Sequence, residues 1–280
     1  MIREIESQTI ERAISECILR VEYNIDPEIK RAVEEHELTE ISETGRQVLR
    51  QLSENYKIAA DEQIAICQDT GMCVVFAEVG QDAHIVGDSF EEAINRAVAD
   101  AYTNLRKSVV NDPLYDRINT KDNTPAIIHS RIVPGSRIKF TVICKGFGSE
   151  NMSRIKMLTP SAGENGVIDF VVETVRLAGA NPCPPIILGV CVGGDFEQAA
   201  VYAKLMTAEG MSYRHSDSRY QRLEEKIGAR INALGIGPAG FGGNTTLLKL
   251  NICSLPTHIA GMPCAVNVCC HASRHGTVEI

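Results

Sequence analysis

The 280-residue sequence contains no tryptophan, and only 5% of its residues are aromatic. It also lacks a basic excess, because 28 lysines and arginines are outnumbered by 36 aspartates and glutamates, giving a net charge of −8. Proteins that bind nucleic acid usually carry a basic excess, so this composition argues against a nucleic-acid partner. No apolar run approaches the roughly 18 residues that span a bilayer, and we expect no membrane partner.

Ten cysteines are present, but nothing else suggests a disulfide framework, which is typical of small secreted domains. The first residues are charged and lack the apolar core of a signal peptide, so we expect a cytoplasmic protein. Most of the cysteines lie in apolar patterns and are expected to be small buried side chains. These are Cys17, Cys144, Cys191 and Cys253, with Cys73 and Cys264 interpreted in the same way.

The first hundred residues are predicted to be helical. Apolar residues recur at helical spacing over 10–21, Asp26-Pro27 is typical of a helix start, and a third helix is expected over 41–60. Ser89 and Glu92 form a capping-box pattern before an apolar stripe that extends to Leu105.

Beyond residue 125 the apolar period changes. Strands are predicted near 138–144, 186–192, 248–252 and 264–269, with helices at about 165–178, 195–209 and 217–233. The fold class is therefore α/β, with α+β as the alternative: a helical N-terminal part followed by a mixed sheet flanked by helices. We expect residues 1–280 to form one domain, which could consist of two closely packed lobes.

Three cysteines instead lie in segments rich in turn-forming residues. Cys67 is followed by Gln-Asp-Thr-Gly, Cys183 stands between prolines, and Cys270 precedes His-Ala-Ser-Arg. Thiolates are soft ligands, and three of them could hold an iron–sulfur cluster with one iron open to substrate. The residues alone predict a metal or cluster site for an anionic substrate.

Two glycine-rich segments could bring backbone N–H groups close to an anion. Residues 235–240 match a dinucleotide fingerprint but follow a helix instead of a strand, which argues against that function. Residues 145–151 follow a predicted strand and could be a simple turn or a carboxylate-binding loop.

With these motifs the sequence resembles the α subunit of the two-subunit class I (iron–sulfur) fumarate hydratases, a family that includes L-tartrate dehydratase. The resemblance covers essentially the whole chain. The segments that carry it are 67–71, 105–108, 145–151, 181–185, 237–246 and 270–274.

The resemblance implies a [4Fe–4S] cluster held by Cys67, Cys183 and Cys270. Cys269 is a second candidate for the last ligand, but Ala272 and Arg274 match the family spacing from Cys270. The resemblance also implies a set of residues around the substrate. Asp69 and His258 are the candidate catalytic residues, and Gln68, Arg106, Gly146, Gly148 and Ser149 are the candidate substrate-binding residues.

The expected activity is the reversible hydration of fumarate to (S)-malate, a reaction of the tricarboxylic acid cycle. Asp69 could bind the substrate hydroxyl or act structurally, and no general base is evident in the chain. The resemblance implies a separate β subunit that completes the site, in a heterotetramer of two α and two β chains. The alternatives are an L(+)-tartrate dehydratase α subunit and a non-enzymatic iron–sulfur or zinc-binding scaffold.

Overall fold

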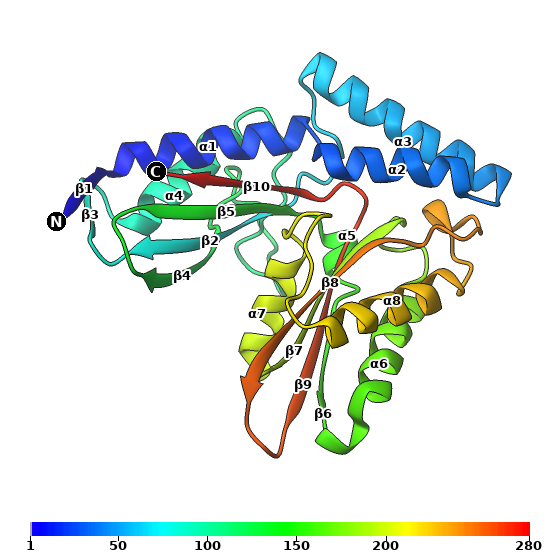
Figure 1. Cartoon of the computed structure of the whole chain (residues 1–280). Coiled ribbons are helices and arrows are strands. Elements are labelled where there is room, and N and C mark those ends of the chain that lie inside the picture. Colours follow the sequence, from blue (N-terminus) through cyan, green and yellow to red (C-terminus); the bar gives the residue numbers. More distant parts are fainter. Residues whose placement is uncertain (1) are drawn as a thin grey trace. The chain divides into compact units, whose positions relative to one another are not determined.

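The computed structural model describes residues 2–280, which divide into two compact units. Unit 1 comprises residues up to 26 together with 58–147 and 274–280, and unit 2 comprises 27–57 and 148–273. Helices and mixed sheets make up both units (Figure 1), so the predicted α/β class is confirmed.

Unit 1 contains a four-stranded sheet in the order β10-β5-β2-β4. Strand β5 (Ile138–Lys145) is antiparallel to both β10 (Arg274–Glu279) and β2 (Met72–Gly80), whereas β2 is parallel to β4 (Ile127–Val133). Apolar residues of α1 (Ser7–Tyr23) and α4 (Phe90–Ala101) form one core with β2 and β5. A small parallel pair, β1 (Arg3–Glu6) and β3 (Ala83–Val86), completes this unit.

Unit 2 contains the sheet β6-β9-β7-β8. Its strands are β6 (Arg154–Leu158), β9 (Met262–Cys269), β7 (Ile186–Gly194) and β8 (Leu247–Thr257). Within this unit α6 (Gly163–Ala178) and α8 (Ser218–Asn232) lie on one side of the sheet and α7 (Phe196–Met206) on the other (Figure 1). The helix α2 (Pro27–Thr39) and most of α3 (Glu43–Glu62) also belong to unit 2.

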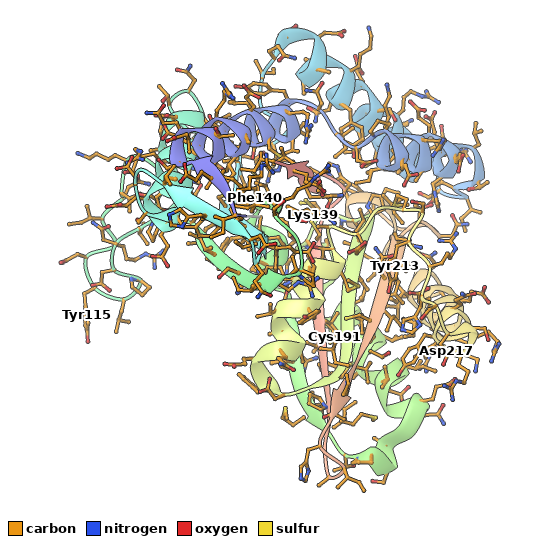
Figure 2. The ribbon with its side chains drawn as sticks, turned by 60° about the vertical axis from the view of Figure 1, so that its left-hand side comes forward. Tyr115, Lys139, Phe140, Cys191, Tyr213 and Asp217 are labelled. Atoms are coloured by element: carbon orange, nitrogen blue, oxygen red, sulfur yellow. The ribbon has the colours of Figure 1, made fainter. Side chains whose placement is uncertain are left out.

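Strand β7 is buried on both faces, as its continuous apolar run predicts. Ile186, Leu188 and Val190 pack in the core that includes α6 and α8, whereas Cys191 packs with two alanines of α7. Figure 2 labels Cys191 on this strand. The alternation follows from the two-residue period of a strand.

The sequence signals for helix starts are confirmed. Helix α2 begins at Pro27, and the capping box before α4 is present: Glu92 N–H donates to Ser89 Oγ and Ser89 N–H donates to Glu92 Oε2. Asp195 caps α7 and Asp217 caps α8 through their side chains.

The prediction that the first hundred residues are helical is wrong for the short strand β1 and, over a longer stretch, for residues 72–86. They form β2 and β3, and β2 is an inner strand of the unit 1 sheet. Met72-Cys-Val-Val-Phe-Ala forms an apolar run between Gly71 and Gly80, without the alternation that marks a half-buried strand. A strand buried on both faces shows no such alternation, which explains the error.

The segment between α4 and β4 contains no helix or extended strand beyond an isolated bridge of Val110 with Asn119. Tyr115, in this segment, is 82% exposed and points away from the rest of unit 1 (Figure 2). Asp112 accepts backbone N–H bonds from Leu114, Tyr115 and Asp116, and these bonds fix the turn. Among residues 2–280, none of the helices combines the length and apolarity needed to cross a bilayer.

Gly189 of β7 lies against the backbone of α7. A Cβ at this position would stand 2.0 Å from the carbonyl oxygen of Ala203, which cannot move without shifting the helix. We expect Gly189→Ala to reduce the free energy of unfolding by about 3 kcal/mol, at the upper end of overpacking costs. Urea unfolding followed by circular dichroism measures the change.

Gly228→Ala in α8 is the matched control. Its Cβ would meet only Leu247 Cδ2, at an ordinary 3.6 Å, and alanine is the better helix former. This variant should be as stable as the parent protein or more so. Equal stability of the two variants would contradict the packing of α7 on β7.

Candidate functional site

In unit 1, the register of the sheet brings residues of three predicted segments to the same end of the strands. Met72, which follows the Cys67–Gly71 turn, pairs with Lys145, which precedes Gly146. Arg274 pairs with Cys144 on the other side of the same strand. The turns at the start of β2, the end of β5 and the start of β10 therefore converge, although they are far apart in the sequence.

An open pocket of about 450 Å³ in unit 1 brings Cys67, Gln68 and Arg106 together. Cys67 is partly exposed and its thiol donates to Gln68 Oε1 at 3.4 Å. Arg106 is exposed, and its carbonyl oxygen accepts a bond from the buried Thr70 hydroxyl at 2.6 Å. The main chain at Arg106 is thus fixed while its guanidinium side chain remains accessible to an anion.

Asp69 connects two of the converging turns through its carboxylate. Oδ1 accepts the N–H of Gly71 at 3.0 Å, and Oδ2 accepts the N–H of Phe147 at 2.8 Å. Both oxygens therefore bind backbone, which favours the structural role over direct action on substrate. Gly146 lies beside this carboxylate, since a Cβ there would be 3.2 Å from Asp69 Oδ2.

A buried ion pair that no pattern in the sequence indicated lies at this end of the strands. Arg274 Nη1 donates to Glu22 Oε2 at 3.0 Å, and the two side chains are 1% and 0% exposed. Burial raises the pKa of Glu22 to about 7, while the charge of Arg274 opposes this shift. The sequence signal was an acidic residue on the apolar face of α1, four positions after Ile18.

In unit 2, Cys183 and Cys270 lie at the same end of the sheet. Cys269 pairs with Ile187 near the start of β7, and Cys183 precedes that strand by three residues. His258 follows β8, whose Thr257 pairs with Gly194 at the other end of β7. The structure therefore places His258 about 25 Å from the two cysteines along the strands, and does not bring it to their end of the sheet.

The glycine-rich segment 237–246 supports the Cys183 turn. Ala239 N–H donates to the carbonyl oxygen of Pro184 at 2.7 Å. The segment contains a short 3-10 turn, η2 (Pro238–Gly240). It follows α8 and precedes β8, the reverse of the strand-then-helix order of a nucleotide-binding unit. The rejection of the dinucleotide fingerprint is therefore consistent with the fold.

The anion that this segment binds is a carboxylate of the chain itself. Glu40, only 2% exposed, accepts the N–H groups of Asn244 and Thr245 at 2.8–3.1 Å and that of Ser42 at 2.8 Å. Burial alone would raise the pKa of Glu40, but these hydrogen bonds outweigh burial and hold the pKa below its ordinary value. No periodic pattern in the sequence indicates a contact between residues 40 and 244.

The Cys270 segment is anchored by Tyr56 of α3. The Tyr56 hydroxyl lies 2.8 Å from His271 Nδ1, and the tyrosine is 2% exposed. Burial raises the pKa of this phenol, and the nearby Cys270 raises it further. Tyr56 was also missed, because an aromatic residue at helical spacing from Leu49 is typical of an ordinary core position.

The remaining loop residues follow Gly146. Helix α5 (Phe147–Glu150) carries Gly148 and Ser149, and the chain passes from unit 1 to unit 2 within it. Ser149 is 3% exposed, and Gly148 is exposed. A Cβ on Gly148 would lie 3.7 Å from the carbonyl oxygen of Asn181, so this loop adjoins the segment before Cys183 within unit 2.

The three candidate ligands differ from the other cysteines in exposure. Cys183 is exposed and Cys67 and Cys270 are partly exposed, whereas all the others are buried except Cys253, which is partly exposed beside Cys191. Cys269 ends β9 and is 5% exposed, so Cys270 is the more accessible of the two neighbours. Soft thiolates on exposed turns fit an iron–sulfur cluster.

The ligand set itself is divided between the units, with Cys67 in unit 1 and Cys183 and Cys270 in unit 2. Over residues 2–280, the structure gathers no group of three His, Cys, Asp or Glu side chains that could hold a metal ion. The joint ligation by three cysteines therefore stays a prediction.

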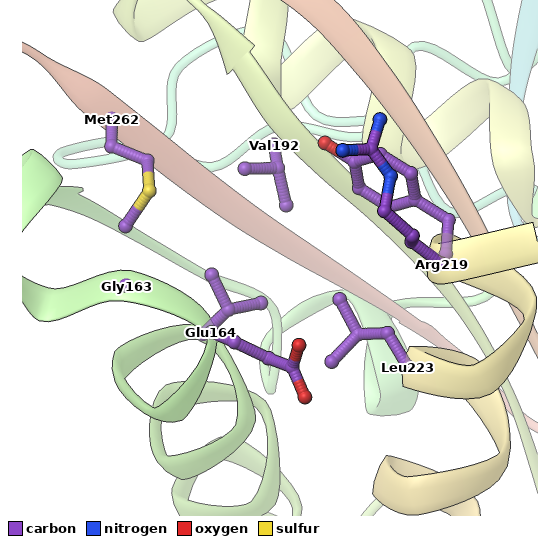
Figure 3. Close-up of a pocket in the computed structure, with 8 residues that line it drawn as sticks. Gly163, Glu164, Val192, Arg219, Leu223 and Met262 are labelled. Carbon is purple, nitrogen blue, oxygen red and sulfur yellow. The ribbon is translucent and has the colours of Figure 1, made fainter. Parts of the chain in front are cut away.

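A second pocket, of about 280 Å³, lies in unit 2 between the starts of α6 and α8 (Figure 3). Val192, Leu223 and Met262 give it an apolar lining, with Glu164 and Arg219 beside them. None of the predicted site residues lines this pocket. Its lining offers no thiolate, and its arginine, Arg219, is already paired with Asp217.

Replacing Glu40 with glutamine tests the internal anion site. The amide would place an NH₂ group against backbone N–H donors, and we expect the free energy of unfolding to fall by about 2–3 kcal/mol at pH 7. Because the folded-state pKa of Glu40 is lowered, its stabilisation is present above pH 4.5 and is lost as the pH falls through the folded-state pKa. Urea unfolding from pH 3 to 7 should show the two proteins converging in acid.

The control is Glu173→Gln, which removes an exposed carboxylate paired with Arg176 on α6. Exposed pairs of this kind contribute little to stability, so this variant should unfold almost like the parent protein. Identical losses in the two variants at pH 7 would contradict the anchoring role of Glu40.

Comparison with known proteins agrees with these observations. Residues 11–279 match the Fumerase family, described as fumarate hydratase. A putative L(+)-tartrate dehydratase subunit alpha of Methanocaldococcus jannaschii is 34% identical over 90% of this chain and 91% of its own length. The L(+)-tartrate dehydratase subunit alpha of Escherichia coli K12 is 31% identical over 86% of this chain and 80% of its own length. The chain therefore belongs to the fumarate hydratase (Fumerase) family of hydro-lyases.

Proposed function

We propose that this chain is the α subunit of an iron–sulfur hydro-lyase that interconverts fumarate and (S)-malate, with a separate β subunit completing the active site. The observation that carries this proposal is the pocket that brings Cys67, Gln68 and Arg106 together in a chain that matches the Fumerase family over residues 11–279. The names of the relatives, each a subunit alpha, support a β partner.

Cys67, Cys183 and Cys270 would hold a [4Fe–4S] cluster. When bound, such a cluster supplies a Lewis-acidic iron that polarises the carbon–oxygen bond to be broken or made. The remaining chemistry of this chain is the binding and orientation of the dicarboxylate.

Arg106 is the main anion-binding side chain of the proposal. Its guanidinium group can bind a carboxylate through two parallel hydrogen bonds, which fixes orientation as well as position. Gln68 offers an amide donor beside Cys67 in the same pocket. These fixed donors also stabilise the charge that grows on the carboxylate when the neighbouring carbon loses its proton.

Asp69 acts in this proposal as a positioning residue, since both of its oxygens accept backbone N–H bonds. No residue lining the unit 1 pocket is a carboxylate or a histidine. The proton-transferring group is therefore assigned to the β subunit. We propose that two α and two β chains form the complete enzyme.

The competing substrate is L(+)-tartrate, which the names of the relatives favour. Tartrate carries one more hydroxyl than malate. A site that hydrogen-bonds the additional hydroxyl of tartrate would strongly reject malate, because buried polar groups of the site would be left without partners. The ratio of kcat/KM for the two substrates therefore distinguishes the two functions.

Cluster ligation is tested by visible absorption of the anaerobically reconstituted chain. The parent protein should show broad visible absorption that is lost in Cys67→Ser, Cys183→Ser and Cys270→Ser, because each thiolate is a ligand. Cys269→Ala is the control and should keep the colour. Colour that survives in Cys270→Ser and disappears in Cys269→Ala would move the third ligand to Cys269.

Substrate binding is tested by kinetics of the αβ complex, with fumarate hydration and L-tartrate dehydration measured side by side. Arg106→Lys keeps the charge but loses the paired donors, so KM should rise about 10- to 100-fold, the equivalent of one charged hydrogen bond. Arg137→Lys, at an exposed ion pair with Glu279, is the control and should change nothing.

The parent complex decides between the substrates, and the α chain alone should be inactive with both. A higher kcat/KM for tartrate would make the chain a tartrate dehydratase subunit. Full turnover by the α chain without its partner would contradict the divided active site.

A further inference from the structure

Burying the Glu22–Arg274 pair costs desolvation free energy, and apolar side chains could fill the same space in the core. Removing two charges from water costs several kcal/mol, and a buried ion pair often contributes no net stability relative to apolar residues. Glu22 is the last residue but one of α1 and lies on its apolar face, and Arg274 begins β10; both side chains are almost fully buried. Such a pair indicates a positional role.

Arg274 Nη2 and the Asp69 carboxylate both lie next to Gly146. A Cβ built on Gly146 would lie 3.4 Å from Arg274 Nη2 and 3.2 Å from Asp69 Oδ2, so the two groups flank the same face of this glycine. Asp69 is also close enough to Glu22 for its charge to raise the pKa of Glu22. Two carboxylates therefore share the neighbourhood of one buried guanidinium group.

Glu22 also contacts the Cys67 segment through its backbone. Its carbonyl oxygen accepts the N–H of Ile66 at 2.9 Å, directly before Cys67. Its side chain binds Arg274, four residues after Cys270. Glu22 thus contacts both the residue that precedes Cys67 and the strand that follows Cys270.

We propose that Glu22 is a positioning residue for Asp69. By neutralising Arg274, Glu22 leaves the Asp69 carboxylate on the N–H groups of Gly71 and Phe147. Without Glu22, the buried guanidinium group would draw Asp69 toward itself, because Asp69 is the other carboxylate beside it. The turns at Cys67–Gly71 and Gly146–Phe147 would then lose the bonds that hold them together. The inference rests on the proposed function for its effect on turnover, but not for its effect on the backbone.

Hydrogen exchange of the full chain at pH 8 tests the backbone effect. In Glu22→Gln, the Gly71 and Phe147 amides should exchange at least tenfold faster, while the amides of Ala97 and Val98 in α4 stay protected. Glu279→Gln is the matched control, because it breaks an exposed ion pair of the same strand, β10. Unchanged exchange at Gly71 and Phe147 in Glu22→Gln would overturn the proposal.

The double variant Glu22→Gln/Arg274→Met separates charge from packing. It removes the Arg274 guanidinium group together with the Glu22 carboxylate, so protection at Gly71 and Phe147 should return to within about threefold of the parent protein. If Glu22→Gln alone loses protection throughout unit 1, the double variant still tests the positioning role of Glu22. A double variant that recovers protection neither locally nor across the unit would overturn the proposal.

Kinetics of the αβ complex provide the functional measurement. Glu22→Gln should lower kcat about 10- to 100-fold, as loss of a supporting hydrogen-bond partner does at metal sites, with KM changed less than threefold because Arg106 is untouched. An unchanged kcat despite fast exchange at Gly71 would contradict the role of Glu22 in turnover. An inactive parent complex would instead count against the proposed function, and the exchange result would stand on its own.

Discussion

Irregular backbone leaves some of its N–H groups without a partner in a helix or sheet, and this constraint governs the segments that carry the exposed cysteines. A buried N–H group without a partner costs free energy comparable to a lost hydrogen bond. Helices and strands pair these groups internally. Turns pair only some of them, as Cys183 N–H does with the carbonyl oxygen of Ala180, and the rest need side-chain partners. Here the partners include Asp69 for the turn before β2 and Glu40 for the segment beside the Cys183 turn. The turns at or beside Cys67 and Cys183 thus depend on carboxylates of the chain, of which Glu40 is buried and Asp69 is half-buried.

The helices contribute these groups as well as the core. Glu22 lies at the end of α1, Glu40 just after α2, and Tyr56 within α3. Each contacts the neighbourhood of a different cysteine, through Ile66, the 243–245 backbone and His271 respectively. The N-terminal helices and the residues directly after them therefore support the candidate site residues in each unit. These hydrogen bonds explain why polar side chains are buried there.

Much of the fold was predictable because it follows from local signals. The cap of α4, the proline at the start of α2 and the apolar run of β7 each depend on residues within a few positions of one another. Strand β2 was missed because a strand buried on both faces lacks the alternation that distinguishes it from a helix. The turns that carry Cys67, Cys183 and Cys270 were found from composition, since proline, glycine and aspartate mark turns.

The support of the site could not be predicted in the same way. The bond between Glu40 and Thr245 and that between Glu22 and Arg274 join residues more than two hundred positions apart, and no period in the sequence indicates such pairs. His258 shows the converse difficulty. Its residue type suits catalysis, but the register of β7 with β8 places it at the far end of the unit 2 sheet.

The division of the chain between the two units has a consequence for its synthesis. Unit 1 takes its edge strand from residues 274–279, after the whole of unit 2 has been translated. Arg274 also arrives only then, so Glu22 remains without its counter-charge while the ribosome makes the intervening 250 or so residues. Unit 1 can therefore complete its sheet only after all of unit 2 has been synthesised, and until then the edge of β5 that pairs with β10 stays open.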